Sequence, residues 1–159
     1  DIVYQRNNLQ SLLNCDDEIA VMIDINWLDL WRIRQDNPLD DAETLVINKN
    51  GHIDELGRKP VNYEKIEGQY TGLIKVRSDM LNKLIEFYNQ LDRSAEYDGQ
   101  NFYNMYMTSF LQLLIDKGWK VRAVLVNSGW LEIDTLDDLT KYESMAKEGK
   151  LEQFYRPDN

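Results

Sequence analysis

The stretch Glu18-Ile19-Ala20-Val21-Met22-Ile23-Asp24-Ile25 decides the fold class. In an extended chain, successive side chains point to opposite faces, so every second residue shares a face. One face of this stretch carries β-branched residues, and these are Ile19, Val21, Ile23 and Ile25. The other face carries Ala20, Met22 and Asp24. The pattern predicts a β-strand over residues 18–25, and a second apolar run predicts another over residues 120–126.

Strand and helix patterns alternate on both sides of this stretch. Asn50-Gly51 lies between strand-like runs at 44–47 and 52–56, and it predicts a hairpin because both turn positions need positive φ. Other expected strands lie at residues 2–4, 69–76 and 130–133, and expected helices at 9–13, 27–33, 78–91, 104–117 and 135–147. This order predicts a single α/β domain over residues 1–159, a three-layer α/β/α sandwich with a mixed, mainly parallel sheet.

Several residues are expected to mark the ends of helices. Asn7 or Asn8 suits the N-cap of the first helix, and Ser78 suits that of the third. Gly118 suits the position just beyond the fourth helix. The last residues, 156–159, are expected to form a loose tail.

Composition excludes several classes of function. The chain of 159 residues carries 28 acidic and 18 basic residues, a net charge of −10. This charge argues against non-specific binding of nucleic acid and against docking on an anionic membrane. Cys15 and His52 are the sole cysteine and histidine, so a disulfide framework and the common zinc sites are excluded. The first residues show no signal-peptide pattern, and we expect a cytoplasmic protein.

The densest group of carboxylates lies near the C-terminal end of the chain. Glu132 and Asp134 are two positions apart in an extended stretch and would project from one face. Mg²⁺ prefers such oxygen ligands, often one or two carboxylates with substrate phosphates. The alternative is a helix start, because Thr135 and Asp138 form a capping-box-like pattern. Asp1, at the head of a strand, either faces a cleft or is merely exposed.

Aromatic and basic residues offer two further candidate sites. A cationic ligand group could bind among the aromatic rings of Trp27, Trp31, Tyr70 and Trp130 through cation–π contacts. The alternative is that these rings belong to the core. Arg58-Lys59-Pro60 provides two cations suited to phosphates, although most basic pairs in loops are only solvated.

Several stretches together resemble the nucleotidyltransferase superfamily, in its phosphocholine cytidylyltransferase-like and sugar-phosphate nucleotidyltransferase branch. Asp1-Ile2-Val3-Tyr4 is similar to a strand of that family that begins with a metal-binding Asp. The other similar stretches are Asp41-Ala42-Glu43-Thr44, Gly57-Arg58-Lys59-Pro60, Gly68-Gln69-Tyr70-Thr71-Gly72-Leu73-Ile74, Tyr106-Met107-Thr108-Ser109-Phe110-Leu111-Gln112 and Gly129-Trp130-Leu131-Glu132-Ile133-Asp134-Thr135. They occur in the family's order, and the similarity extends to about Met145.

The resemblance implies transfer of a nucleotidyl group with release of pyrophosphate. CTP is the expected donor, and the expected acceptor is a phosphorylated or phosphonate molecule such as phosphocholine or a sugar phosphate. Asp1 and Asp134 are the implied Mg²⁺ ligands, and Lys59 is the implied contact to a phosphate. Glu132 competes with Asp134 for the second metal position. The expected substrate-binding residues are Trp27, Tyr70, Gly72, Thr108, Trp130 and Glu132.

The family's enzymes begin with a Gly-rich loop, an Arg and a Lys that bind the nucleoside triphosphate, and these residues contain no such segment. We therefore expect the chain to be the C-terminal two-thirds of a nucleotidyltransferase domain and to be inactive alone. One alternative is an inactive regulatory or interaction domain derived from this fold. Another is a glycosyltransferase of related fold, although Asp40-Asp41-Ala42-Glu43 is not the Asp-x-Asp motif of that class.

Overall fold

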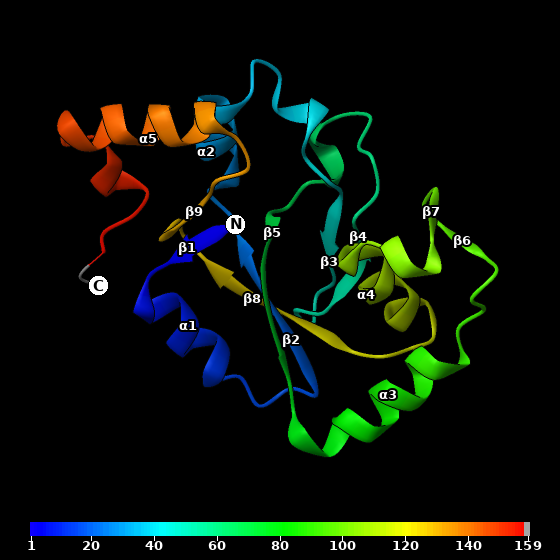
Figure 1. Ribbon diagram of the computed structural model, residues 1–159. Coiled ribbons are helices and arrows are strands. Elements are labelled where there is room, and N and C mark those ends of the chain that lie inside the picture. The colour runs from blue at the N-terminus through cyan, green and yellow to red at the C-terminus, as the bar shows by residue number, and fades with distance from the viewer. Residues whose placement is uncertain (158–159) are drawn as a thin grey trace.

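The computed structural model describes residues 1–157, and a sheet of three strands forms its centre. Strand β2 (Ile19–Asp24) lies between β5 (Gln69–Val76) and β8 (Val121–Val126), as Figure 1 shows. Strands β2 and β8 pair in parallel, whereas β5 runs antiparallel to β2. The strands predicted at these positions are confirmed.

The other elements surround this sheet. The helices are α1 (Arg6–Leu13), α2 (Trp27–Arg34), α3 (Leu81–Gln90), α4 (Met107–Asp116) and α5 (Leu136–Lys147). The remaining strands are β1 (Ile2–Tyr4), β3 (Leu45–Ile47), β4 (Ile53–Leu56), β6 (Glu96–Tyr97), β7 (Gln100–Asn101) and β9 (Trp130–Glu132). No helix within residues 1–157 has the length and apolar character needed to cross a membrane.

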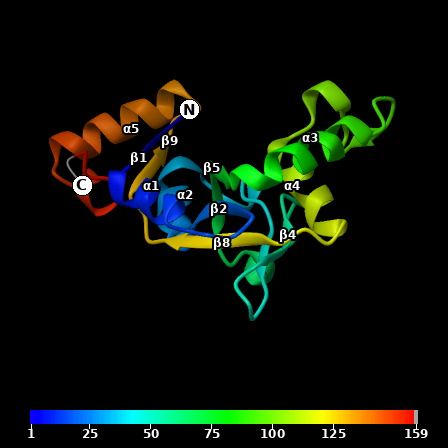
Figure 2. The same ribbon diagram turned by 90° about the horizontal axis from the view of Figure 1, so that it is seen from below.

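Strand β2 lies at the centre of the molecule, and every one of its residues is buried. On one face, Ile19, Val21 and Ile23 pack in a cluster with side chains of α4 and β4. On the other face, Met22 packs with side chains of α2, β9 and α5. Figure 2 shows α1 and α5 with the β1–β9 pair on one side of the central strands, and α3 and α4 on the other. Helices therefore cover both faces, and the predicted three-layer α/β arrangement is confirmed.

The sheet is mixed, as predicted, but parallel pairs do not dominate. Within residues 1–157, β2–β8 is the one parallel pair of strands, while β1–β9, β2–β5, β3–β4 and β6–β7 are antiparallel. The β3–β4 hairpin turns at Gly51, whose φ of +77° agrees with the predicted Asn-Gly turn. Two of the four antiparallel pairs, β3–β4 and β6–β7, are local hairpins, and the other two join distant strands, so "mainly parallel" was wrong.

The ends of the helices follow the sequence only in part. The predicted caps at Asn7 and Asn8 are wrong, because Gln5 precedes α1 and makes no side-chain capping bond. Ser78 begins a short 3₁₀ turn ahead of α3 instead of capping it through its side chain. Gly118 follows α4 with a φ of +84°, as predicted. At the C-terminal end, Arg156 binds the carbonyl of Glu152, and residues 158–159 of the predicted tail lie outside the described residues.

Candidate active site

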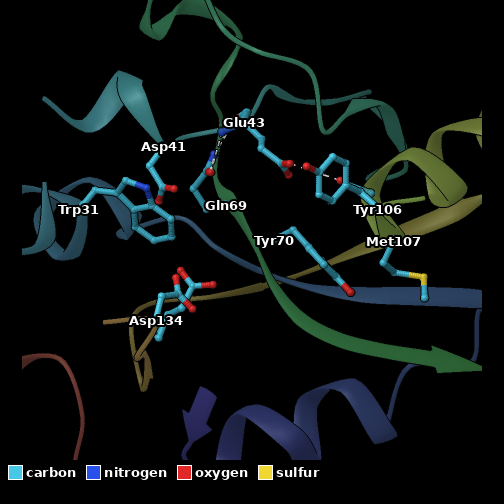
Figure 3. A pocket seen from close by; sticks show the side chains of 10 residues that line it. Trp31, Asp41, Glu43, Gln69, Tyr70, Tyr106, Met107 and Asp134 are labelled. Carbon is cyan, nitrogen blue, oxygen red and sulfur yellow. Dashed lines mark hydrogen bonds between the residues drawn. The ribbon is translucent and has the colours of Figure 1, made fainter. Parts of the chain in front are cut away.

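A cavity of about 280 Å³ lies at the carboxyl end of the parallel strands β2 and β8, where α/β proteins commonly bind ligands. Its walls come from α2, the loop that precedes β3, the start of β5, the start of α4 and the segment that follows β9. The lining residues are Trp31, Asp41, Glu43, Gln69, Tyr70, Tyr106, Met107, Thr108, Glu132 and Asp134 (Figure 3). Tyr70, Thr108, Glu132 and Asp134 were predicted as site residues, and the structure brings them together here.

Arg34, in the last turn of α2, lies behind the acidic wall of this cavity. Its guanidinium donates to Glu132 at 2.5 Å, to Asp134 at 2.7 Å and to Asp138 at 3.2 Å. The carboxylate of Asp41 is 3.9 Å away, and the Arg34 side chain is 1% exposed. Burial disfavours the charged guanidinium, but the carboxylates of Glu132 and Asp138 outweigh this effect and raise the pKa of Arg34. Arg34 is therefore a permanent cation that fixes three carboxylates.

Helix α5 takes part in this arrangement through its N-terminal cap. Thr135 accepts a hydrogen bond from the backbone of Asp138, and the Asp138 carboxylate accepts one from the backbone of Thr135, which completes the predicted capping box. The same Asp138 carboxylate accepts from Nε of Arg34. The cap of α5 is thus joined to the cavity wall through one side chain.

The backbone of Asp1 lies beside Asp134, although Asp1 and Ile133, the residue before Asp134, are 132 positions apart. The β1–β9 pairing brings them together, because Ile133 donates a hydrogen bond to the carbonyl of Asp1 at 2.8 Å. The backbone nitrogen of Asp1 is 3.6 Å from Oδ1 of Asp134. Glu132 pairs with Arg34 instead, and its burial raises the pKa of its carboxyl group. Of the two competing residues, Asp134 is the one next to Asp1.

Glu43 is a site residue for which the sequence predicted no role. Its backbone N–H and carbonyl are both bonded to the side-chain amide of Gln69, at 2.9 Å and 2.7 Å, which fixes the loop against β5. Its carboxylate accepts a hydrogen bond of 3.3 Å from Thr108. Burial raises the pKa of the Glu43 carboxyl group, and the charge of Asp41 raises it further. The only signal in the sequence was the motif that contains Asp41 and Glu43.

Two of the four predicted aromatic contacts are corrected by the structure. Trp27 and Trp130 are 4% and 1% exposed and belong to the core, and the Trp130 indole donates to the buried Asp24 at 2.9 Å. Neither ring lines the cavity, because both are packed in the core between α2, β9 and α5. Trp31 and Tyr70 do line it, and burial raises the pKa of Tyr70 to about 12.

Lys59 and Gly72 lie outside this cavity. The ammonium of Lys59 donates to the carbonyls of Leu39 and Asp40, and it lines a neighbouring cavity of about 510 Å³ that shares Asp41, Glu43 and Tyr106 with the first. Gly72 has a φ of +93° where the β2–β5 pairing shifts register. This glycine forms a bulge in β5, and its contact with substrate stays a prediction.

Residues 1–157 contain no cluster of three or more His, Cys, Asp or Glu side chains that could hold a metal ion, either in the cavity wall or elsewhere.

Arg34 is a residue of the site that the sequence analysis did not predict. Its partners Glu132, Asp134 and Asp138 are 98, 100 and 104 positions away, so no local pattern could identify it.

Comparison with known proteins places this geometry in context. No family model matches the chain. The chain is 49% identical over 139 residues to the CTP:phosphoglutamine cytidylyltransferase of Campylobacter jejuni, a match that covers 87% of this chain and 54% of the relative. The chain therefore spans about half the length of that protein.

A solved structure shares the fold. The inositol-1-phosphate CTP transferase from T. maritima superimposes with a TM-score of 0.63 at 16% identity, over 98% of this chain and 55% of that one. At this identity the likeness concerns the fold alone. The C. jejuni relative confirms the resemblance to the nucleotidyltransferase superfamily that the sequence motifs predicted, and the T. maritima structure confirms the α/β fold.

Proposed function

We propose that this chain is part of a cytidylyltransferase, which transfers CMP from CTP to a small phosphorylated acceptor and releases pyrophosphate. The observation that supports this most strongly is the 49% identity to a CTP:phosphoglutamine cytidylyltransferase. Phosphoglutamine is thus a candidate acceptor, beside the phosphocholine and sugar phosphates that the sequence motifs suggested. A cytoplasmic location is part of the proposal, since a nucleoside triphosphate is required.

The proposed reaction needs little acid–base chemistry. An oxygen of the acceptor's phosphate, already an anion, attacks the α-phosphorus of CTP. A new P–O bond forms there while the bond from the α-phosphorus to the bridging oxygen breaks, and pyrophosphate leaves with that electron pair. The task of the protein is then to position two anionic groups and to offset their charge.

The residues around Asp134 fit a Mg²⁺ ion. Asp134 is half-exposed and Asp1 fully exposed, so both carboxylates are open to a ligand. Mg²⁺ takes hard oxygen ligands, typically one or two carboxylates together with substrate phosphates. In the proposal Asp1 and Asp134 bind this ion, which when bound would neutralise charge on the phosphates. Arg34 holds Oδ2 of Asp134 at 2.7 Å and so fixes the direction of its carboxylate.

Other residues have proposed roles in binding. Tyr70 and Thr108 line the cavity and are proposed to contact the acceptor. Lys59 uses its ammonium to bind two carbonyl oxygens, of Leu39 and Asp40. An ammonium has three N–H donors, and we propose that the remaining one contacts a phosphate.

A chimera tests this function. The matching 139-residue segment of the C. jejuni relative is replaced by the corresponding part of this chain, and release of pyrophosphate from CTP is measured with phosphoglutamine. We expect turnover that requires CTP and Mg²⁺. The variant Asp134→Asn of the same chimera is expected to lose most of it, whereas Asp137→Asn, an exposed neighbour in α5, keeps it.

The chain alone is assayed in parallel, and we expect it to stay at background. A chimera that folds, as judged by circular dichroism and a cooperative thermal transition, yet makes no product with any phosphorylated acceptor would refute the proposed function. Equal activity of Asp134→Asn and Asp137→Asn would refute the role of Asp134.

A further inference from the structure

Asp138, in the first turn of α5, is almost completely buried, with 3% of its surface exposed. The side chain of its neighbour Asp137 is 69% exposed, which is usual for a carboxylate on a helix surface. Burial of a carboxylate is unfavourable unless hydrogen-bond donors and an opposite charge surround it. The burial of Asp138 therefore depends on its partners.

One oxygen of Asp138 holds the backbone that carries Asp134. Oδ2 accepts hydrogen bonds from the backbone N–H of Thr135 at 3.0 Å and from that of Asp134 at 3.2 Å. In a capping box, the side chain at this helix position bonds to the backbone N–H of the cap residue, which here is Thr135. The bond to Asp134 is additional to that motif, and it fixes the peptide group of the residue that is proposed to bind Mg²⁺.

The other oxygen of Asp138 reaches the carboxylate of Asp134 through Arg34. Oδ1 accepts from Nε of Arg34 at 3.2 Å, and Nη2 of the same guanidinium donates to Oδ2 of Asp134 at 2.7 Å. The guanidinium is planar, so a partner at Nε helps to fix the direction in which Nη2 points. Asp138 thus acts on Asp134 at two places, directly at its backbone and through Arg34 at its side chain.

These contacts leave one oxygen of Asp134 for a ligand. Arg34 takes Oδ2, whereas Oδ1 lies 3.6 Å from the backbone nitrogen of Asp1, and half of the side chain is exposed. Carboxylates that bind metal ions are commonly oriented by hydrogen bonds from residues that do not touch the metal. A carboxylate whose rotamer is fixed beforehand is better placed to bind.

We propose that Asp138 is a positioning residue, which holds Asp134 so that its Oδ1 can bind a divalent cation. This inference rests on the proposed function, because that function assigns Asp134 as a Mg²⁺ ligand. Asp138 then has a role besides the cap of α5. The two roles can be separated, because the cap also needs Thr135, to which Arg34 makes no hydrogen bond within residues 1–157.

Mn²⁺ alone is the probe, and its binding to the chain is measured by electron paramagnetic resonance of the free ion. Asp138→Asn keeps the shape of the side chain but has a single acceptor oxygen, which cannot serve both the backbone and Arg34. Loss of a residue that orients a metal ligand weakens metal binding by about 10–100-fold. We therefore expect Asp138→Asn to raise the Kd of Mn²⁺ by at least about tenfold.

Thr135→Ala is the matched control, because it weakens the same cap and leaves the contact between Asp138 and Arg34 in place. It should bind Mn²⁺ as the unchanged chain does, although urea unfolding should show a loss of stability in both variants. Asp134→Asn is the positive control and should also weaken binding.

Several results would overturn the inference. These are an unchanged Mn²⁺ affinity in Asp138→Asn, an equal loss of affinity in Thr135→Ala, and no binding of Mn²⁺ by the unchanged chain. Should Asp138→Asn not fold, Arg34→Lys breaks the same link at its other member, since an ammonium cannot reproduce the guanidinium fork. An unchanged Mn²⁺ affinity in that variant would overturn the inference as well.

The outcome is separable from that of the proposed function. Weaker Mn²⁺ binding in Asp138→Asn, combined with a folded chimera that makes no product, would refute the transferase activity and leave the positioning role standing. A chimera that makes product, combined with full Mn²⁺ affinity in Asp138→Asn, would refute the positioning role and leave the transferase activity standing.

Discussion

Substitution of Arg34 by alanine is expected to destabilise the protein strongly. The side chain is 1% exposed, and it donates to three carboxylates at 2.5, 2.7 and 3.2 Å. Removal of one partner from a buried ion-pair network costs about 3–5 kcal/mol, because the opposite charges stay behind. Glu132 and Asp134 are 28% and 50% exposed, so water can partly solvate them in the variant. We therefore expect the free energy of unfolding to fall by about 3–4 kcal/mol, the lower part of that range.

The assay is urea unfolding at pH 7, followed by tryptophan fluorescence and by circular dichroism. Trp31 reports directly, because the Arg34 guanidinium lies 5.2 Å from the centre of its ring. For a chain of this size, the expected loss lowers the thermal midpoint by about 6–16 °C. Arg34→Lys should fall between wild type and Arg34→Ala, since one ammonium cannot reproduce the guanidinium fork.

Arg32→Ala is the control on the same helix. Its side chain is 62% exposed and pairs with Asp29 at 3.2 Å, an exposed pair worth at most about 1 kcal/mol. If Arg34→Ala and Arg32→Ala unfold at the same urea concentration with the same slope, the reasoning fails, and Arg34 cannot be the group that orients Asp134. Should Arg34→Ala not fold, Arg34→Lys against Arg32→Lys makes the same comparison.

Further substitutions test single contacts. Burial raises the pKa of Glu43 above its ordinary 4.5. The unfolded chain therefore ionises this group more readily, and the folded state loses stability as the pH rises from 4.5 through the raised pKa. Glu43→Gln should therefore raise the thermal midpoint at pH 7, and the gain should vanish below about pH 4. Gly57→Ala should destabilise more than Gly99→Ala in urea unfolding: both have positive φ, but the new Cβ at Gly57 would lie 2.6 Å from Cβ of Thr108, while at Gly99 it meets nothing within 4 Å. Thr135→Ala should cost about 1 kcal/mol by the same assay, through loss of the α5 cap.

Local signals in the sequence predicted most of the fold. The Asn50-Gly51 turn and the capping box of α5 depend on residues a few positions apart, and both are confirmed. The caps at Asn7 and Asn8 failed because a distant partner competes for one of them. The side chain of Asn8 donates to the carbonyl of Ser128 at 2.8 Å and is thus used to attach α1 to the turn before β9.

The candidate site was harder to predict, because long-range packing decides it. Tyr70, Thr108 and Asp134 line the cavity as expected. The same reasoning predicted Trp27 and Trp130 as cavity residues. The sequence around an aromatic residue at the end of a helix or strand has the same pattern whether its ring faces a cavity or the core. Only the packing between α2 and β9 places both rings inside.

The arrangement of charges divides the site into two ends. Glu132, Asp134 and Asp138 are compensated by Arg34, so this end of the cavity can receive anionic phosphates without the full repulsion of three carboxylates. Asp41 is 3.9 Å from the same guanidinium, whereas Glu43 forms no ion pair within residues 1–157 and accepts a hydrogen bond from Thr108. One buried arginine thus offsets the charge of the carboxylates of the β9–α5 segment, and Glu43 is the carboxylate of the cavity wall that it does not reach.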